Sequence, residues 1–207
     1  MRILGATIFS SLIIIIYMIA RSEHLSGAKN NRALKSYLER ESKSNSTRKK
    51  DISKLDYVVL NLSTLAIDIA MKHNLEQLVN ELNCFSSKKI INLSSYSNTD
   101  LKLMYGPANL DVLSEYDNNF TELIKLLNKI GDSLYDLEEY DGAASFYEYA
   151  IHIGSDITNT YVKLCTIYNT NNEAAKIKEL KHKASKITSL SGPIILDKIN
   201  HIKMENK

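Results

Sequence analysis

Histidine and cysteine are the side chains of this chain with the widest metal-binding and catalytic chemistry. The histidines form no HExxH pair, and none stands beside a cysteine at the spacing of a zinc site. Cys84 and Cys165 fall within apolar helical patterns, where a buried structural cysteine is the usual case. The seven glycines are scattered and form no phosphate-binding loop. We therefore predict no metal site and no cofactor.

A serine at position 133 is the second candidate for chemistry. It lies in Gly131–Leu134, a Gly-Asp-Ser-Leu stretch that resembles the nucleophile motif of an esterase family. In that family the serine follows a strand, and a later Asp-x-x-His supplies the base. Here the preceding residues have helical apolar spacing, and the late pair Asp197 and His201 is separated by four positions rather than three. A serine inside a helix lacks the sharp turn that exposes a nucleophile, so we predict that the chain is not an enzyme.

The charge pattern indicates how the elements are organised. The chain has 207 residues and a net charge of +2, but residues 21–54 carry ten Lys or Arg against four Asp or Glu. Residues 55–207 carry fifteen against twenty. Two prolines and seven glycines supply few turns for a many-stranded β fold, so we predict an all-α protein.

The first twenty residues have the character of a membrane anchor. Ile3 to Ala20 contains no charge and, at about 1.5 Å per residue, spans roughly 27 Å as a helix. The hydrocarbon core of a bilayer is ~30 Å thick, so we predict a transmembrane helix over residues 1–20. The alternative is a cleaved signal peptide, which has a shorter apolar run and small residues before the cut; here Met18 occupies one of those sites.

The flanks of this segment predict its orientation. Five Lys or Arg lie within about 20 residues after it, whereas only Arg2 precedes it, and the positive-inside rule keeps the more basic flank in the cytoplasm. We therefore expect a single-pass membrane protein with a cytoplasmic body. The reverse orientation stays open because the N-terminal tail is very short.

Residues 21–53 are expected to form a basic linker, with a short helix over residues 33–41. The following acidic body argues against nucleic-acid binding. Two interpretations of the basic residues in the linker remain. They are attracted to anionic lipid headgroups, or they serve as a topology signal alone. The residues concerned are Lys43, Arg48, Lys49 and Lys50.

Residues 54–190 have apolar residues at three- and four-residue spacings, which predicts paired helices. Residues 55–86 are consistent with one hairpin, and 86–118 are irregular apart from one or two helical turns expected over 109–116. Helices resume after Asn118. Gly154–Asp156 is expected to end one helix and cap the next. Residues 191–207 are expected to form a terminal helix, capped by Ser191, that covers the end of the domain.

The residues after 124 carry a family resemblance. Large and small apolar side chains alternate over two helices in a pattern that resembles a tetratricopeptide repeat over residues 124–157, with a poorer copy over 158–190. The resemblance implies a solenoid of helical hairpins. The residues that would pack the repeat are Leu127, Ile130, Gly131, Leu134, Tyr140, Ala143, Tyr147 and Ala150.

The same resemblance implies a protein-binding groove lined by the first helix of each repeat. It predicts a membrane-tethered adaptor that binds another protein. The alternatives are a structural subunit that self-associates and a packed helical body without a groove. The residues that would face the groove are Lys125, Asn128, Asp132, Tyr135, Asp136, Asn159, Val162, Thr166 and Asn169.

Overall fold

The computed structural model describes residue 18 and residues 31–202, and the secondary structure of this part is entirely helical. The expected all-α class is therefore confirmed. The predicted anchor over residues 1–20 lies outside the described residues except for Met18. Within the described part, no helix combines the length and the apolar character needed to cross a membrane.

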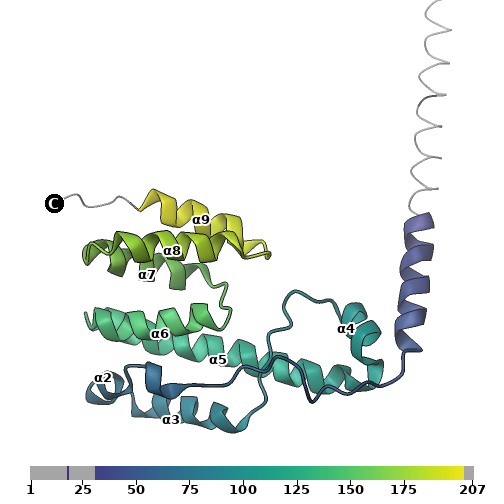
Figure 1. Cartoon of the computed structure of the whole chain (residues 1–207), viewed down its shortest axis with the longest axis horizontal. Helices are drawn as coiled ribbons and strands as arrows, with labels where there is room; N and C mark the ends of the chain where they lie inside the picture. The colour runs from purple at the N-terminus through teal and green to yellow at the C-terminus, as the bar shows by residue number, and fades with distance from the viewer. Residues whose placement is uncertain (1–17, 19–30, 203–207) are drawn as a thin grey trace, which may run out of the picture. The chain divides into compact units, whose positions relative to one another are not determined.

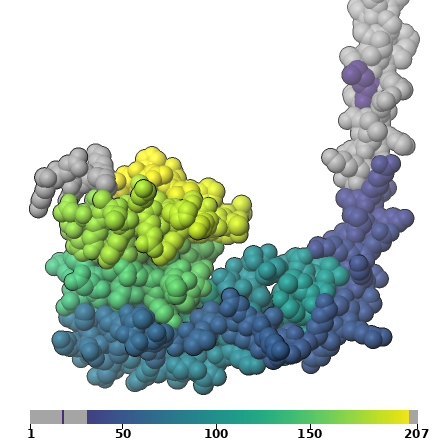
Figure 2. Space-filling model, in the orientation of Figure 1, coloured from purple at the N-terminus to yellow at the C-terminus, as the bar shows by residue number. Residues whose placement is uncertain are grey.

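The chain forms two compact units, and the larger one contains residues 51–97 and 109–207. It is a stack of antiparallel helical hairpins (Figure 1). α2 (Ile67–Lys72) pairs with α3 (Glu76–Cys84), α5 (Leu110–Asp136) with α6 (Tyr140–His152), and α7 (Thr158–Thr170) with α8 (Ala174–Ser185). A final helix, α9 (Ser191–His201), packs on α7 and α8. Figure 2 shows these layers as successive bands from blue to yellow.

The three hairpins share one connection geometry. Each connection has three residues, and its middle residue has a positive φ: 59° at Asn74, 62° at Glu138 and 57° at Asn172. The next residue in each donates its backbone N–H to a carbonyl five positions back, at 2.8–3.1 Å. This pairing satisfies the last carbonyls of the first helix. Glu138 and Asn172 lie 34 positions apart, and residues 67–84 form a third, shorter hairpin of the same kind.

The long helix α5 begins earlier than the sequence predicts. It starts at Leu110 rather than after Asn118 and includes the helical turns expected over 109–116, because Leu113, Phe120 and Leu123 continue the buried stripe. From Phe120 onward its buried apolar side chains belong to a core that runs from Leu65 in the first layer to Ile199 in α9. That continuity joins all layers of the larger unit into one hydrophobic interior.

Two helix starts lack the side-chain caps that the sequence predicts. Asp156 does not cap α7, whose cap position is Ile157; its carboxylate instead accepts hydrogen bonds from the Ser189 and Ser191 hydroxyls at 2.8 and 2.9 Å. Ser191 is the first residue of α9, and Leu190 is at the cap position. The predicted terminal helix is present, but its first turn is tied back to the loop before α7.

The smaller unit contains the described residues up to Lys50 together with residues 98–108. A helix over residues 31–45, longer than the expected 33–41, is joined to α4 (Asn98–Tyr105) by side-chain hydrogen bonds. Glu41 accepts these bonds from Thr99 and Lys102 of α4. Gly106 has a φ of 86°, and a Cβ there would lie 2.6 Å from the Arg48 carbonyl oxygen, so only glycine permits this close approach. Lys50 N–H also donates to the Tyr105 carbonyl at 3.0 Å.

Candidate functional site

The side chains predicted to line a groove lie on one side of the larger unit, on α5 and α7. We call this surface the α5–α7 face. Lys125 and Asp136 are exposed on α5, and Asn159 is exposed on α7. Five others are partly buried: Asp132, Tyr135, Val162, Thr166 and Asn169.

Asp132 is the centre of a hydrogen-bonded cluster on this face. Its Oδ1 accepts from the Tyr147 hydroxyl at 2.6 Å and from Lys163 Nζ at 2.8 Å. Lys163 Nζ also lies 3.8 Å from Asp136 Oδ1 and 4.7 Å from the centre of the Tyr135 ring. The pKa of Tyr147 is raised well above its usual range, first by burial and then by its hydrogen bond to Asp132. The cluster joins α5, α6 and α7 to one another.

Asn128 differs from the groove prediction because it is buried. Its side-chain amide donates to the Ile124 carbonyl at 2.7 Å, and its carbonyl oxygen accepts from the Thr160 hydroxyl of α7. These bonds satisfy its polar atoms inside the protein, so Asn128 holds α5 to α7 and presents nothing to a partner.

Close packing between α5 and α6 depends on the small residues of the predicted repeat. A Cβ on Gly131 would lie 2.7 Å from Tyr147 Cε1, so the Tyr147 ring occupies the space that a larger residue would need. Ala143 and Ala150 are also fully buried in α6. Tyr140 is the exception: it is 41% exposed, and its ring meets the edge of Tyr135 instead of the core.

A pocket of about 770 Å³ opens beside α6 and α8, the second helices of their hairpins. The sequence does not predict this pocket. We call it the α6–α8 pocket. Its walls are α6, α8, the end of α7 and the chain before η1 (Leu62–Thr64). Its apolar lining is Val58, Val59, Ile151, Ile153, Leu164 and Leu180, and its main polar lining is Asp56, Glu148, His152, Lys176, Glu179 and Lys183.

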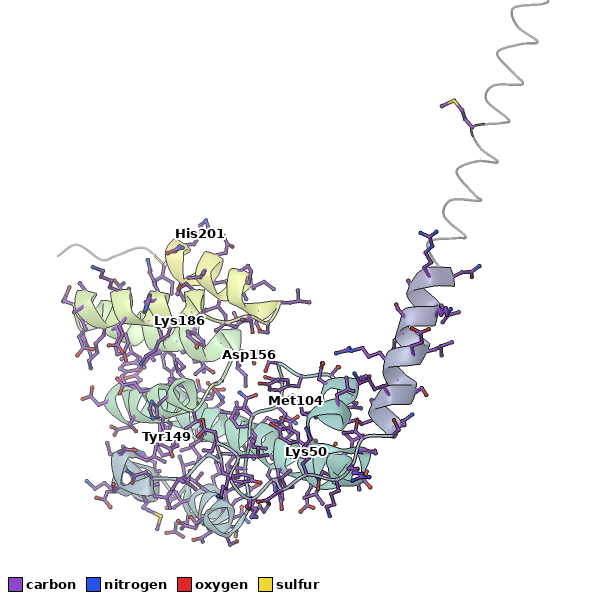
Figure 3. All side chains as sticks on the ribbon, turned by 45° about the vertical axis from the view of Figure 1, so that its right-hand side comes forward. Lys50, Met104, Tyr149, Asp156, Lys186 and His201 are labelled. Atoms are coloured by element: carbon purple, nitrogen blue, oxygen red, sulfur yellow. The ribbon has the colours of Figure 1, made fainter. Side chains whose placement is uncertain are left out.

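One wall of the pocket is held to α6 by two side chains. The Tyr149 hydroxyl accepts from Asn61 N–H at 2.8 Å and lies 3.5 Å from the Val59 carbonyl oxygen (Tyr149 is labelled in Figure 3). Ser145 Oγ accepts from Ala66 N–H at 3.1 Å. The repeat pattern predicts that Ser145, two positions after Ala143, faces outward. In the structure the preceding segment covers α6 at this point, and the Ser145 hydroxyl accepts from its backbone.

Charged groups line the opposite wall in pairs. Glu148 accepts from the Tyr168 hydroxyl at 2.6 Å and lies 3.7 Å from Lys176 Nζ. Lys183 and Glu179 form a second pair at 2.9 Å. The pKa of Glu179 is lowered by its hydrogen bond to Lys183. The pocket therefore combines apolar side chains with groups of both charges, which suits a segment with an apolar side chain between polar groups.

The comparisons with known proteins add no assignment to this geometry. No family model matches the chain, and neither the curated proteins nor the solved structures contain a match. Among residues 18 and 31–202, no three His, Cys, Asp or Glu side chains are grouped as ligands for a metal ion. The pocket and the α5–α7 face are therefore the candidate binding surfaces of the larger unit.

Proposed function

We propose that this chain is a membrane-tethered adaptor with tetratricopeptide-like hairpins, and that it binds a segment of another protein in the α6–α8 pocket. The observation that carries the proposal is the open volume of about 770 Å³ between α6, α8 and residues 56–64. Ligand sites are commonly concave, largely apolar and about 300–1,000 Å³ in volume. The tether is the apolar run Ile3–Ala20.

The pocket is a better candidate than the α5–α7 face because it offers an open volume together with an exposed apolar side chain. On that face Asp132 is engaged by both Tyr147 and Lys163, and Asn128 is buried. A partner binding there would have to displace internal hydrogen bonds, and a buried group left without a partner costs about 1–3 kcal/mol. In the pocket, Val59 is 84% exposed and available for contact.

Selection of peptides from a display library on the full chain tests this proposal. Val59→Asp, on the pocket wall, is expected to weaken binding of the selected peptides by about tenfold or more, as for a contact residue worth over ~1 kcal/mol. Lys125→Glu, on the α5–α7 face, is the control and should leave binding unchanged. Both residues are exposed, so melting temperatures should stay close to wild type.

Two outcomes would count against the pocket. Loss of binding on Lys125→Glu but not on Val59→Asp would move the site to the α5–α7 face. A failure to select any peptide that competes at the pocket would contradict the adaptor function itself.

A structural subunit that self-associates is the second candidate. Exposed apolar side chains at the start of α9 favour it, since Leu190 is 92% exposed and Ile194 lies one turn further along. Replacing Leu190 by Ser should then lower the oligomer fraction in sedimentation, while peptide binding in the pocket would persist.

A further inference from the structure

An apolar ridge lies along the N-terminal half of the helix over residues 31–45. Leu34, Tyr37 and Leu38 are spaced three and four positions apart, so they share one side of the helix. They are 56%, 60% and 56% exposed. Three large apolar side chains left together in water on one helical turn indicate a surface that meets something else.

Basic side chains flank this ridge. At about 100° per residue, Lys35 and Arg40 fall on its two sides, and long basic side chains can extend sideways while their stems stay on an apolar surface. Arg32 and Lys43 lie on the far side of the helix. This is the arrangement of helices that lie in the interface of a bilayer.

The charge of the smaller unit is also positive. Residues 31–50 and 98–108 contain eight Lys or Arg and three Asp or Glu. Each acid has a basic partner: Glu39 with Lys35, Glu41 with Lys102 and Asp100 with Arg40. The hydrogen bond from Lys102 lowers the pKa of Glu41, the acid in line with the ridge. The five Lys or Arg residues in excess of the acids give the smaller unit a positive charge that complements an anionic surface.

We infer that the helix over residues 31–45 lies on the surface of an anionic bilayer, with Leu34, Tyr37 and Leu38 inserted among the headgroups. The basic cluster that includes Arg48 and Lys49 then lies near the same surface. The inference rests on the proposed anchor for its proximity to a membrane, because only ten residues separate Ala20 from Asn31 in the sequence. The inference goes beyond the adaptor function because it assigns a second ligand, the membrane surface, to the smaller unit.

Tryptophan fluorescence of the full chain tests this directly, since the chain contains no tryptophan. Leu38→Trp reports from the ridge, and Ser36→Trp, about 160° away around the helix, is the matched control. In vesicles of phosphatidylglycerol and phosphatidylcholine, we expect Leu38→Trp to emit at shorter wavelength than Ser36→Trp. We also expect brominated lipid to quench Leu38→Trp several-fold more strongly.

A second arm tests the charge. Each basic residue near an anionic surface changes membrane affinity by about fivefold, so Arg48→Gln with Lys49→Gln should reduce the quenching of Leu38→Trp. The control pair Lys129→Gln and Lys178→Gln, exposed on the larger unit, should leave the quenching unchanged. Vesicles of pure phosphatidylcholine, which carry no net charge, should also reduce the quenching of Leu38→Trp.

Any of four results would overturn the inference. Equal quenching of the two tryptophans would place the ridge in water. A short-wavelength emission from Leu38→Trp without quenching by brominated lipid would indicate that protein, such as a second copy, covers the ridge. If the chain failed to float with vesicles, the anchor would fail together with the inference; flotation without quenching would remove the inference alone.

Discussion

The Tyr147 hydroxyl donates a 2.6 Å hydrogen bond to Asp132, while the Tyr147 ring occupies the space beside Gly131. One side chain of α6 thus contacts two consecutive residues of α5. The Tyr147 ring can approach α5 closely because Gly131 has no side chain. The hydroxyl is buried with the ring, and Asp132 supplies its hydrogen-bond acceptor. Lys163 approaches the same carboxylate from α7 at 2.8 Å. The contact therefore connects the packing within one hairpin to the position of the next.

Tyr147→Phe should destabilise the domain without changing the packing of the ring. Hydrogen bonds to charged groups are worth about 1.5–3 kcal/mol, and the partial exposure of Asp132 favours the lower end. A double-mutant cycle with Asp132→Ala, measured by urea denaturation, isolates the interaction from other effects. Tyr140→Phe, at an exposed ring, is the control. Additive effects of the two cluster substitutions would show that the hydrogen bond contributes nothing.

Ala143→Leu should destabilise the domain by about 1–3 kcal/mol. Ala143 is fully buried where α6 packs on α5, and added methylenes in a filled core displace neighbours. Ala175→Leu introduces the same side chain at an exposed position of α8 and should change the free energy of unfolding by under about 0.5 kcal/mol. Equal effects of the two substitutions would argue against the position of Ala143 at the helix contact.

The sequence predicts the hairpins after residue 124 because their apolar and small residues follow the helical period closely. Gly131 and Tyr147 are a clear example, since both residue types have a packing reason visible in the pattern. The start of α5 is not predictable in this way: Leu113 and Phe120 are separated by polar residues, and only the neighbouring layer shows which side is buried.

The pocket and the surroundings of Asn128 depend on long-range contacts that no local pattern contains. Asn61 and Tyr149 are 88 positions apart, and Asn128 and Thr160 are 32 apart. Repeat spacing predicts Asn128 on the groove side, but it cannot show that the side chain is buried and accepts a hydrogen bond from Thr160. The same holds for Ser145, whose partner Ala66 lies 79 positions earlier.

Alkaline pH should destabilise the folded domain through its buried tyrosines. Burial, with a further contribution from the charge of Asp156, raises the pKa of Tyr161 from 10.0 to about 12. Between these values the unfolded chain has released a proton that the folded protein still holds, so stability falls as pH rises. Below pH 10 the contribution is fully present. The slope from this residue is at most about 1.4 kcal/mol per pH unit.

Urea denaturation of Tyr161→Phe across this pH range measures the contribution. The variant should show a shallower alkaline loss of stability than the wild type, with the remaining slope coming from groups such as Tyr147 and Tyr168, whose pKa values burial also raises. Tyr96→Phe, at an exposed residue, should keep the wild-type slope. An unchanged slope in Tyr161→Phe would show that its phenol ionises alike in both states.

Ile195→Ala should reveal whether α9 closes the end of the stack. Ile195 is fully buried and lies on a helix that packs on both α7 and α8, so its truncation leaves a cavity at the last layer. Such Ile→Ala changes cost about 2–5 kcal/mol. Ile194, its neighbour in the chain, is 51% exposed, and Ile194→Ala should cost under about 0.5 kcal/mol. Urea denaturation of the two variants compares identical chemistry at adjacent positions. If both losses were small, α9 would not be covering the α7–α8 hairpin, and the terminal helix would have no capping role.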